Sequence, residues 1–148
     1  MNALADIFLP LKEAHQEAVG LANCWRGRCV NLFAKGERII GEALRKHDPD
    51  KPLPMLLSQR VAKLTALLST DCKKTSALKA FAAEADQRNA IVHGDGKVFV
   101  DRYGQWLLTL HALDRSGSVS RQVAQAEGDQ QLRNLKSVVD RLAALLRD

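Results

Sequence analysis

The sequence predicts an all-α protein, a four-helix up-and-down bundle with a small β-hairpin inserted between the third and fourth helices. Apolar residues recur at three- and four-residue steps along most of the 148 residues, as they do in helices that bury one face. The exception is the segment 97–112, which is rich in the β-branched and aromatic residues that favour strands. A chain of this length can bury one hydrophobic core. We therefore assign residues 1–148 to a single domain.

Prolines, glycines and capping residues set the expected helix boundaries. The four helices are expected at residues 3–46, 55–69, 76–93 and 119–147. Pro10 fits best in a first helical turn, so the main part of the first helix is expected to begin there. Three prolines between His47 and Pro54 exclude a helix in that loop. Thr75 or Ser76 is expected to cap the third helix, and Gly128 could break the fourth.

The predicted hairpin consists of two strand-like segments joined at Tyr103-Gly104. A two-residue turn at this point would place Phe99 opposite Leu108, and Asp101 opposite Trp106. Residues 114–118 are expected to form the loop that follows. Because an isolated hairpin is only marginally stable, it must pack on the helices or on a partner chain, and its role is left open.

Composition favours a soluble protein with an anionic partner. Apolar residues make up 46% of the chain and the formal net charge is +5, which mildly favours an anionic partner. The positive charge is spread along the chain, so no dedicated nucleic-acid-binding arm is expected. Trp25 is expected in the core and Arg26 and Arg28 in solvent, although these three could instead contact RNA.

Three further sequence features suggest a cytoplasmic location without a membrane partner. No apolar run approaches the length of a membrane helix, and no signal-peptide pattern is visible. The three cysteines, at positions 24, 29 and 72, fit reduced thiols better than a disulfide framework. They lack the spacing of a zinc site. We therefore expect no metal and no other cofactor.

Residues 84–94 concentrate an acid, an arginine, an amide and a histidine at the end of the third predicted helix. On one ideal helix, Arg88 and His93 point about 140° apart because they are five residues apart. They are poorly placed to act together within one ideal helix. A two-fold axis, the commonest protein symmetry, could bring Arg88 of one chain to His93 of another. The spacing therefore predicts a composite site in a homodimer.

The local chemistry of this segment suits proton transfer beside a phosphate. Gly94 suits the left-handed position that ends a helix, which would place His93 at the negative helix end that favours imidazolium. Glu84 precedes Arg88 by four residues and could orient its guanidinium, whose fork matches a phosphate. Asn89 could hydrogen-bond the His93 ring and select its tautomer. The structural alternative is a capping histidine and a solvated arginine.

The string Arg88-Asn89, followed by His93, resembles the signature of the HEPN superfamily (higher eukaryotes and prokaryotes nucleotide-binding). That signature is an arginine, usually followed by a polar residue, with a histidine four to six residues further on. Many HEPN proteins are four-helical, dimeric, metal-independent ribonucleases. The resemblance implies that Arg88, His93 and Asn89 are catalytic, that Glu84 supports them, and that a ribose 2′-OH attacks the adjacent phosphate to leave a 2′,3′-cyclic phosphate.

The resemblance also implies partners and a biological setting. It suggests an endoribonuclease of a toxin–antitoxin or antiviral-defence type, whose partners would be substrate RNA, a second copy of the chain, and a cognate antitoxin or nucleotidyltransferase-type protein. One alternative is a non-catalytic HEPN-like module that binds a nucleotide or a protein. Another is a helical adaptor in which the motif is a coincidence. Ser-His-Asp and Cys-His hydrolases are disfavoured, because no nucleophile-elbow string occurs.

Overall fold

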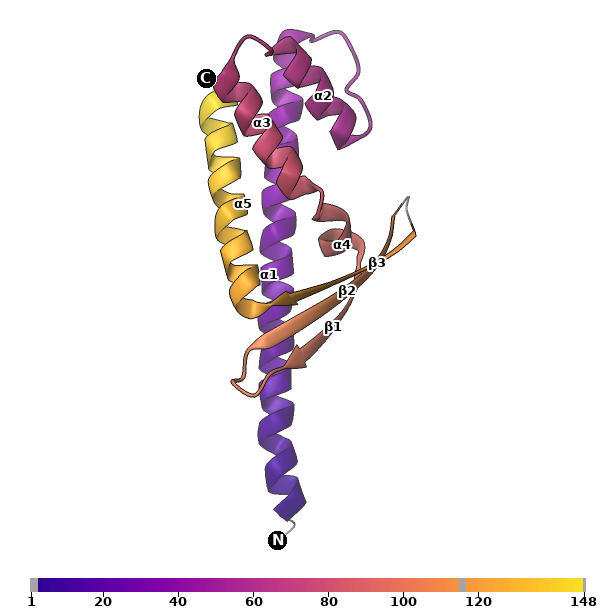
Figure 1. Cartoon of the computed structure of the whole chain (residues 1–148), viewed down its shortest axis with the longest axis vertical. Coiled ribbons are helices and arrows are strands. Elements are labelled where there is room, and N and C mark those ends of the chain that lie inside the picture. Colours follow the sequence, from indigo (N-terminus) through magenta and orange to yellow (C-terminus); the bar gives the residue numbers. More distant parts are fainter. Residues whose placement is uncertain (1–2, 115–116, 148) are drawn as a thin grey trace. The chain divides into compact units, whose positions relative to one another are not determined.

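The computed structural model describes residues 3–114 and 117–147. Within them the protein is mostly helical, with five helices and a three-stranded antiparallel sheet that precedes the last helix (Figure 1). The helices are α1 (Ala3–His47), α2 (Leu57–Leu67), α3 (Cys72–Ala85), α4 (Arg88–His93) and α5 (Gln125–Leu146). The strands are β1 (Asp95–Val100), β2 (Trp106–Asp114) and β3 (Gly117–Ala124). The mainly helical prediction is confirmed, whereas the all-α four-helix bundle with a two-stranded hairpin is corrected.

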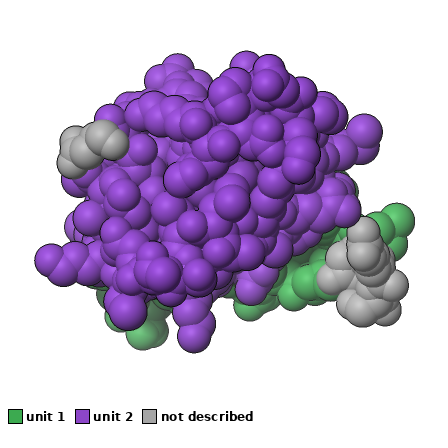
Figure 2. All heavy atoms as spheres, turned by 90° about the horizontal axis from the view of Figure 1, so that it is seen from above, with its two compact units in different colours: residues 1–28, 89–132 green, residues 29–88, 133–148 purple. Residues whose placement is uncertain are grey.

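The chain divides into two compact units, which Figure 2 colours separately. Unit 1 comprises residues 1–28 and 89–132, and unit 2 comprises residues 29–88 and 133–148. Helix α1 packs against α5, and both helices contribute residues to each unit. Each unit is therefore assembled from two stretches of chain that are distant in sequence.

The core of unit 1 lies under one face of the sheet. Trp106, Leu108 and Leu110 of β2 are buried, as alternating residues of a half-covered strand should be. Trp25 of α1 is also buried, with its ring centroid 5.6 Å from that of Trp106. Its indole Nε1 donates a hydrogen bond of 2.6 Å to the Gly128 carbonyl of α5. The prediction that Trp25 belongs to the core is confirmed.

The register between β1 and β2 differs by one residue from the prediction. Leu108 lies opposite Val98, not Phe99, because the connection is longer than a two-residue turn. The Asp101 carboxylate accepts hydrogen bonds from the backbone N–H groups of Tyr103 and Gln105, at 2.8 and 3.0 Å. A one-residue shift moves every side chain to the other face, and Phe99 is accordingly 53% exposed.

The loop between β1 and β2 needs a glycine at its end. Asp101 and Gln105 are joined by a backbone hydrogen bond of 2.9 Å, which leaves three residues in the loop. Gly104 has φ +79°, the left-handed conformation that three-residue hairpin loops require at their last position. The loop chemistry, and not the alternation of the strands, therefore sets the register.

The third strand replaces the start of the predicted fourth helix. Residues 118–123 alternate outward polar and inward apolar or long side chains, ending on buried Val123, which is a strand period. Helix α5 begins only at Gln125 and then continues through Gly128 without a break. Within the predicted loop 114–118, Asp114 and Gly117 pair across β2 and β3, while residues 115–116 lie outside the described residues.

Unit 2 is built from helices. Its core contains large side chains of α1, α3 and α5, among them Phe33, Ile39, Ile40, Phe81 and Leu142, and α2 lies beside α3 (Figure 1). Gly36 is buried with the Phe81 ring directly against it, so that a β-carbon at this position would collide with the ring. The glycine allows α1 and α3 to approach closely.

Three predicted helix boundaries are corrected. Pro10 lies inside α1, since one missing N–H near the end of a long helix removes a single hydrogen bond. Asp71 caps α3, accepting from the N–H groups of Lys73 and Lys74 at 3.1 Å, so the helix begins before Thr75. The third predicted helix is broken after Ala85, where Gln87 N–H bonds to the carbonyl three residues back and tightens the turn.

Candidate functional site

The predicted motif occupies the short helix α4 and the turn before it. α4 runs from Arg88 to His93 and ends where Gly94 N–H donates a 2.9 Å hydrogen bond to Ala90 O. Gly94 does not have a positive φ, which corrects the expected left-handed cap. Glycine is needed there for a different reason, because a β-carbon would collide with the Ala90 carbonyl oxygen. Gly94 thus ends α4 by allowing a close backbone approach.

Arg26 holds the end of α4 in unit 1. Its Nε and Nη2 donate to the Ile91 carbonyl at 3.0 and 2.8 Å, and Nη2 also donates to the Gly94 carbonyl at 2.8 Å. Carbonyls at a helix C-terminus lack intrahelical donors, and a cation is favoured at that end. The prediction that Arg26 is solvated was wrong. Its guanidinium is a structural cap, and no local sequence pattern distinguishes Arg26 from Arg28 in this role.

Arg88 is paired with a carboxylate that sequence analysis did not single out. Its Nε lies 2.6 Å from Glu37 Oε1 of α1, with side chains 37% and 24% exposed. Glu37 Oε1 is buried and accepts no aligned hydrogen bond from the described residues. The close N–O distance therefore reports an ion pair held by charge, with poor N–H alignment. Glu84 belongs to α3 and Arg88 begins α4, so the two residues do not share the single continuous helix on which the predicted i,i+4 pair was based.

Asn89 and His93 differ in how they are held. Asn89 Nδ2 donates to the Leu113 carbonyl of β2 at 3.2 Å, which ties α4 to the sheet. The predicted hydrogen bond between Asn89 and the His93 ring is not formed among the described residues, and the Asn89 amide nitrogen contacts β2 instead. His93 is exposed and makes no hydrogen bond or ion pair with residues 3–114 or 117–147. Its imidazole is available to a ligand or a partner chain.

A second polar cluster lies across the exposed side of the sheet. Ser120 Oγ and His111 Nδ1 are 2.6 Å apart, in a hydrogen bond whose donor depends on the tautomer. His111 of β2 pairs in register with Ser120 of β3 and with Asp95 of β1. Cross-strand polar pairs of this kind stabilise a sheet by a fraction of a kcal/mol, about 0.2–1. The contact joins β2 to β3.

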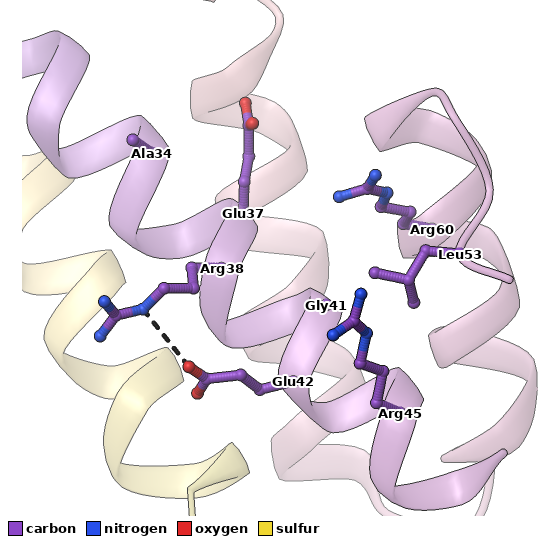
Figure 3. A pocket seen from close by; sticks show the side chains of 8 residues that line it. All are labelled: Ala34, Glu37, Arg38, Gly41, Glu42, Arg45, Leu53 and Arg60. Atoms are coloured by element: carbon purple, nitrogen blue, oxygen red, sulfur yellow. Dashed lines mark ion pairs between the residues drawn. The ribbon is translucent and has the colours of Figure 1, made fainter. Parts of the chain in front are cut away.

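Unit 2 contains an arginine-lined pocket of about 360 Å³ (Figure 3). It lies between the C-terminal part of α1, the loop after it and α2. Its lining residues are Ala34, Glu37, Arg38, Gly41, Glu42, Arg45, Leu53 and Arg60. This pocket could not be predicted from the sequence, because Arg45 and Arg60 lie on different helices and share no motif.

Comparisons of the chain with family models, with curated proteins and with solved structures find no match. The likeness to the HEPN superfamily therefore stays a prediction from the motif. No helix within the described ranges combines the length and the apolar composition that crossing a membrane requires.

Proposed function

We propose that this protein is a metal-independent endoribonuclease of a toxin–antitoxin or antiviral-defence type that acts as a homodimer. The observation that carries the proposal is the exposed imidazole of His93, which has no partner in the described part of the chain. An imidazole exchanges protons near neutral pH. Its position between the α4 end held by Arg26 and the start of β1 gives it a fixed backbone setting.

The reaction would be an intramolecular transesterification in RNA. The 2′-oxygen attacks the adjacent phosphorus while a base removes its proton, the bond to the 5′-oxygen breaks, and that oxygen takes up a proton. The products are a 2′,3′-cyclic phosphate and a 5′-hydroxyl. His93 serves as the proton-transfer group, and Arg88 of the second chain stabilises the negative charge that develops on the phosphate.

The ion pair of Arg88 favours a second candidate function, a non-catalytic module that binds a nucleotide or a protein partner. Its guanidinium is already paired with Glu37, so it must leave or share that carboxylate to contact a phosphate. An arginine that stays in this pair would hold α4 in place, and the motif would then support a binding surface. The two candidates differ for Glu37→Gln, because the ribonuclease should retain or gain cleavage whereas the binding module shows none.

The test compares RNA cleavage by wild-type protein, His93→Ala, Arg88→Ala and Glu37→Gln, all in EDTA and with analysis of the product ends. The ribonuclease proposal predicts cyclic phosphate ends and a loss of about 10²-fold or more for His93→Ala and Arg88→Ala. Glu37→Gln, which releases Arg88 while keeping the side-chain size, should retain or increase cleavage. Light scattering on the same samples should show a dimer.

Melting curves on these variants distinguish the two candidates. For an ion pair with this partial exposure, we expect a coupling of about 1 kcal/mol between Arg88 and Glu37 in a double-mutant cycle. If the wild-type protein shows no RNA cleavage while Arg88→Ala and Glu37→Gln are equally destabilising, the pair is structural and the binding-module hypothesis holds. If light scattering shows a monomer, the composite site between two chains cannot form.

A further inference from the structure

The pocket of unit 2 has an excess of positive charge after its ion pairs are counted. Its two carboxylates are Glu37 and Glu42. Glu37 is paired with Arg88 at 2.6 Å. Glu42 contacts Arg38 Nε at 3.3 Å and Arg147 Nε at 3.5 Å, through different oxygens. Both carboxylates are therefore already matched by cations other than the remaining two arginines of the pocket.

Those remaining two arginines, Arg45 and Arg60, have no carboxylate partner in the described part of the chain. Arg60 Nε donates a 2.6 Å hydrogen bond to the Pro54 carbonyl, which fixes the guanidinium plane and leaves its terminal nitrogens for another acceptor. Arg45 extends from the last turn of α1. Figure 3 shows the two guanidinium groups on either side of Leu53.

We infer that this pocket binds a small phosphomonoester, with its phosphate on Arg45 and Arg60 and its organic part against Leu53. Two forks on separate helices suit a tetrahedral phosphate, because guanidinium N–H groups match its oxygens in pairs. A pocket of about 360 Å³ has the size of a site for a small ligand. This inference concerns unit 2 residues outside the Arg88–His93 motif and does not depend on the ribonuclease proposal.

The half-buried apolar side chain of Leu53 determines which phosphate compound is used as the probe. Leu53 lines the pocket, and a β-carbon at Gly41 would lie 3.4 Å from its Cδ1. A ring carried by the phosphate would cover Leu53, whereas inorganic phosphate would meet only the arginines. Phenyl phosphate should therefore bind more tightly than inorganic phosphate, and phenol, which lacks the charge, should not bind measurably.

The experiment is a calorimetric titration of the full chain at low salt with phenyl phosphate, inorganic phosphate and phenol. We expect phenyl phosphate to bind with Kd of about 1 mM or tighter. Arg45→Ala should weaken it about tenfold or more. Arg45 makes no hydrogen bond or ion pair in the described part of the chain, so Arg45→Ala should change the melting temperature of the protein only slightly. Arg60→Lys keeps the charge and removes the fork, and should weaken binding to a similar extent.

The matched control is Arg141→Ala, which removes the same charge from an exposed position of α5 in unit 2. It should leave the phenyl phosphate affinity unchanged. Equal weakening by Arg45→Ala and Arg141→Ala would mean that the anion only responds to the overall positive charge, and would overturn the inference. The absence of binding at 10-fold higher concentration than the expected Kd of about 1 mM would also overturn it.

Discussion

The two units hold their arginines in different ways. In unit 1, Arg26 is bonded to two backbone carbonyls and has become part of a helix end. In unit 2, Arg88 and Arg38 are paired with carboxylates, and Arg45 has no such partner. A carbonyl cap is fixed by the backbone that it caps, whereas a carboxylate can be exchanged for a ligand anion. Arg26 thus serves the fold of unit 1. In unit 2, Arg45 and the terminal nitrogens of Arg60, whose Nε is bonded to the Pro54 carbonyl, can serve recognition.

The largest expected effect comes from Arg26, which tests the structural half of this comparison. Arg26→Ala removes three charged hydrogen bonds and leaves the Ile91 and Gly94 carbonyls without those donors. We expect a loss of about 2–4 kcal/mol of unfolding free energy, measured by urea denaturation. Arg28→Ala, at an exposed position two residues further on, should change stability by less than about 0.5 kcal/mol. Equal effects would mean that the carbonyl bonds contribute nothing.

The next largest effect is expected at two glycines, one in each unit, that lie directly against an aromatic ring. At Gly36 a β-carbon would collide with the Phe81 ring, and at Gly128 it would lie 2.6 Å from Trp106 Cη2. Alanine at either position should cost about 1–3 kcal/mol through overpacking. Gly27→Ala is the control, because nothing lies within 4 Å of a β-carbon there. It should instead stabilise the protein by about 0.5–1 kcal/mol. The melting temperatures of the three variants test these expectations. A Gly36→Ala variant that melts above the wild type would contradict the packing argument.

A smaller and similar effect is expected from one capping carboxylate in each unit. Asp101 in unit 1 accepts two N–H groups of the β1–β2 loop, and Asp71 in unit 2 accepts two at the start of α3. Each replacement by alanine should cost about 1 kcal/mol. Replacement by asparagine keeps an acceptor oxygen and should recover most of that loss. If asparagine is as destabilising as alanine, the charge and not the hydrogen bonds would be responsible.

The smallest effect is a pH dependence in unit 2. The hydrogen bond from Lys136 to Asp140, 2.7 Å long, lowers the pKa of this exposed carboxyl, assisted by the charges of Lys136 and Lys35. A lowered folded-state pKa gives a contribution that is present above the ordinary carboxyl value and is lost as the pH falls through the folded-state value. The melting temperatures of wild type and Asp140→Asn should therefore differ slightly at pH 7 and converge in acid. A difference that grows in acid would contradict this sign.

Much of the helical part of the fold could be predicted from the periodicity of apolar residues, because this periodicity is a local property of the sequence. The apolar stripes placed α1, α2 and most of α5 within a few residues of their observed positions. The break after Ala85 could not be found this way, since neither glycine nor proline occurs at Asp86 or Gln87. β3 was not predicted, because the alternation of exposed and inward side chains at residues 118–123 is short and adjoins a strong helical pattern. Pairing with β2 makes this segment a strand and not the start of the helix.

The site was predicted less completely than the fold, because its partners are distant in sequence. The positions of Arg88 and His93 on α4 could be anticipated from spacing, but the partner of Arg88 is Glu37 of α1. The bond from Asn89 to Leu113 depends on where β2 lies. Arg26 could be recognised as a cap only after the end of α4 was placed beside α1. Local patterns thus located the motif, and tertiary contacts set what each side chain does.

The interleaving of the two units has a consequence for the order in which this chain can fold. Residues 1–28 gain their unit 1 partners only after residues 89–132 have been made, and unit 2 lacks part of its helical core until residues 133–148 are added. Bringing such distant segments together costs chain entropy before any contact forms. No single cut of the backbone separates one unit from the other. A chain that stalls before residue 133 would therefore leave apolar faces of both units uncovered, and quality-control proteases would meet it as an incompletely folded substrate.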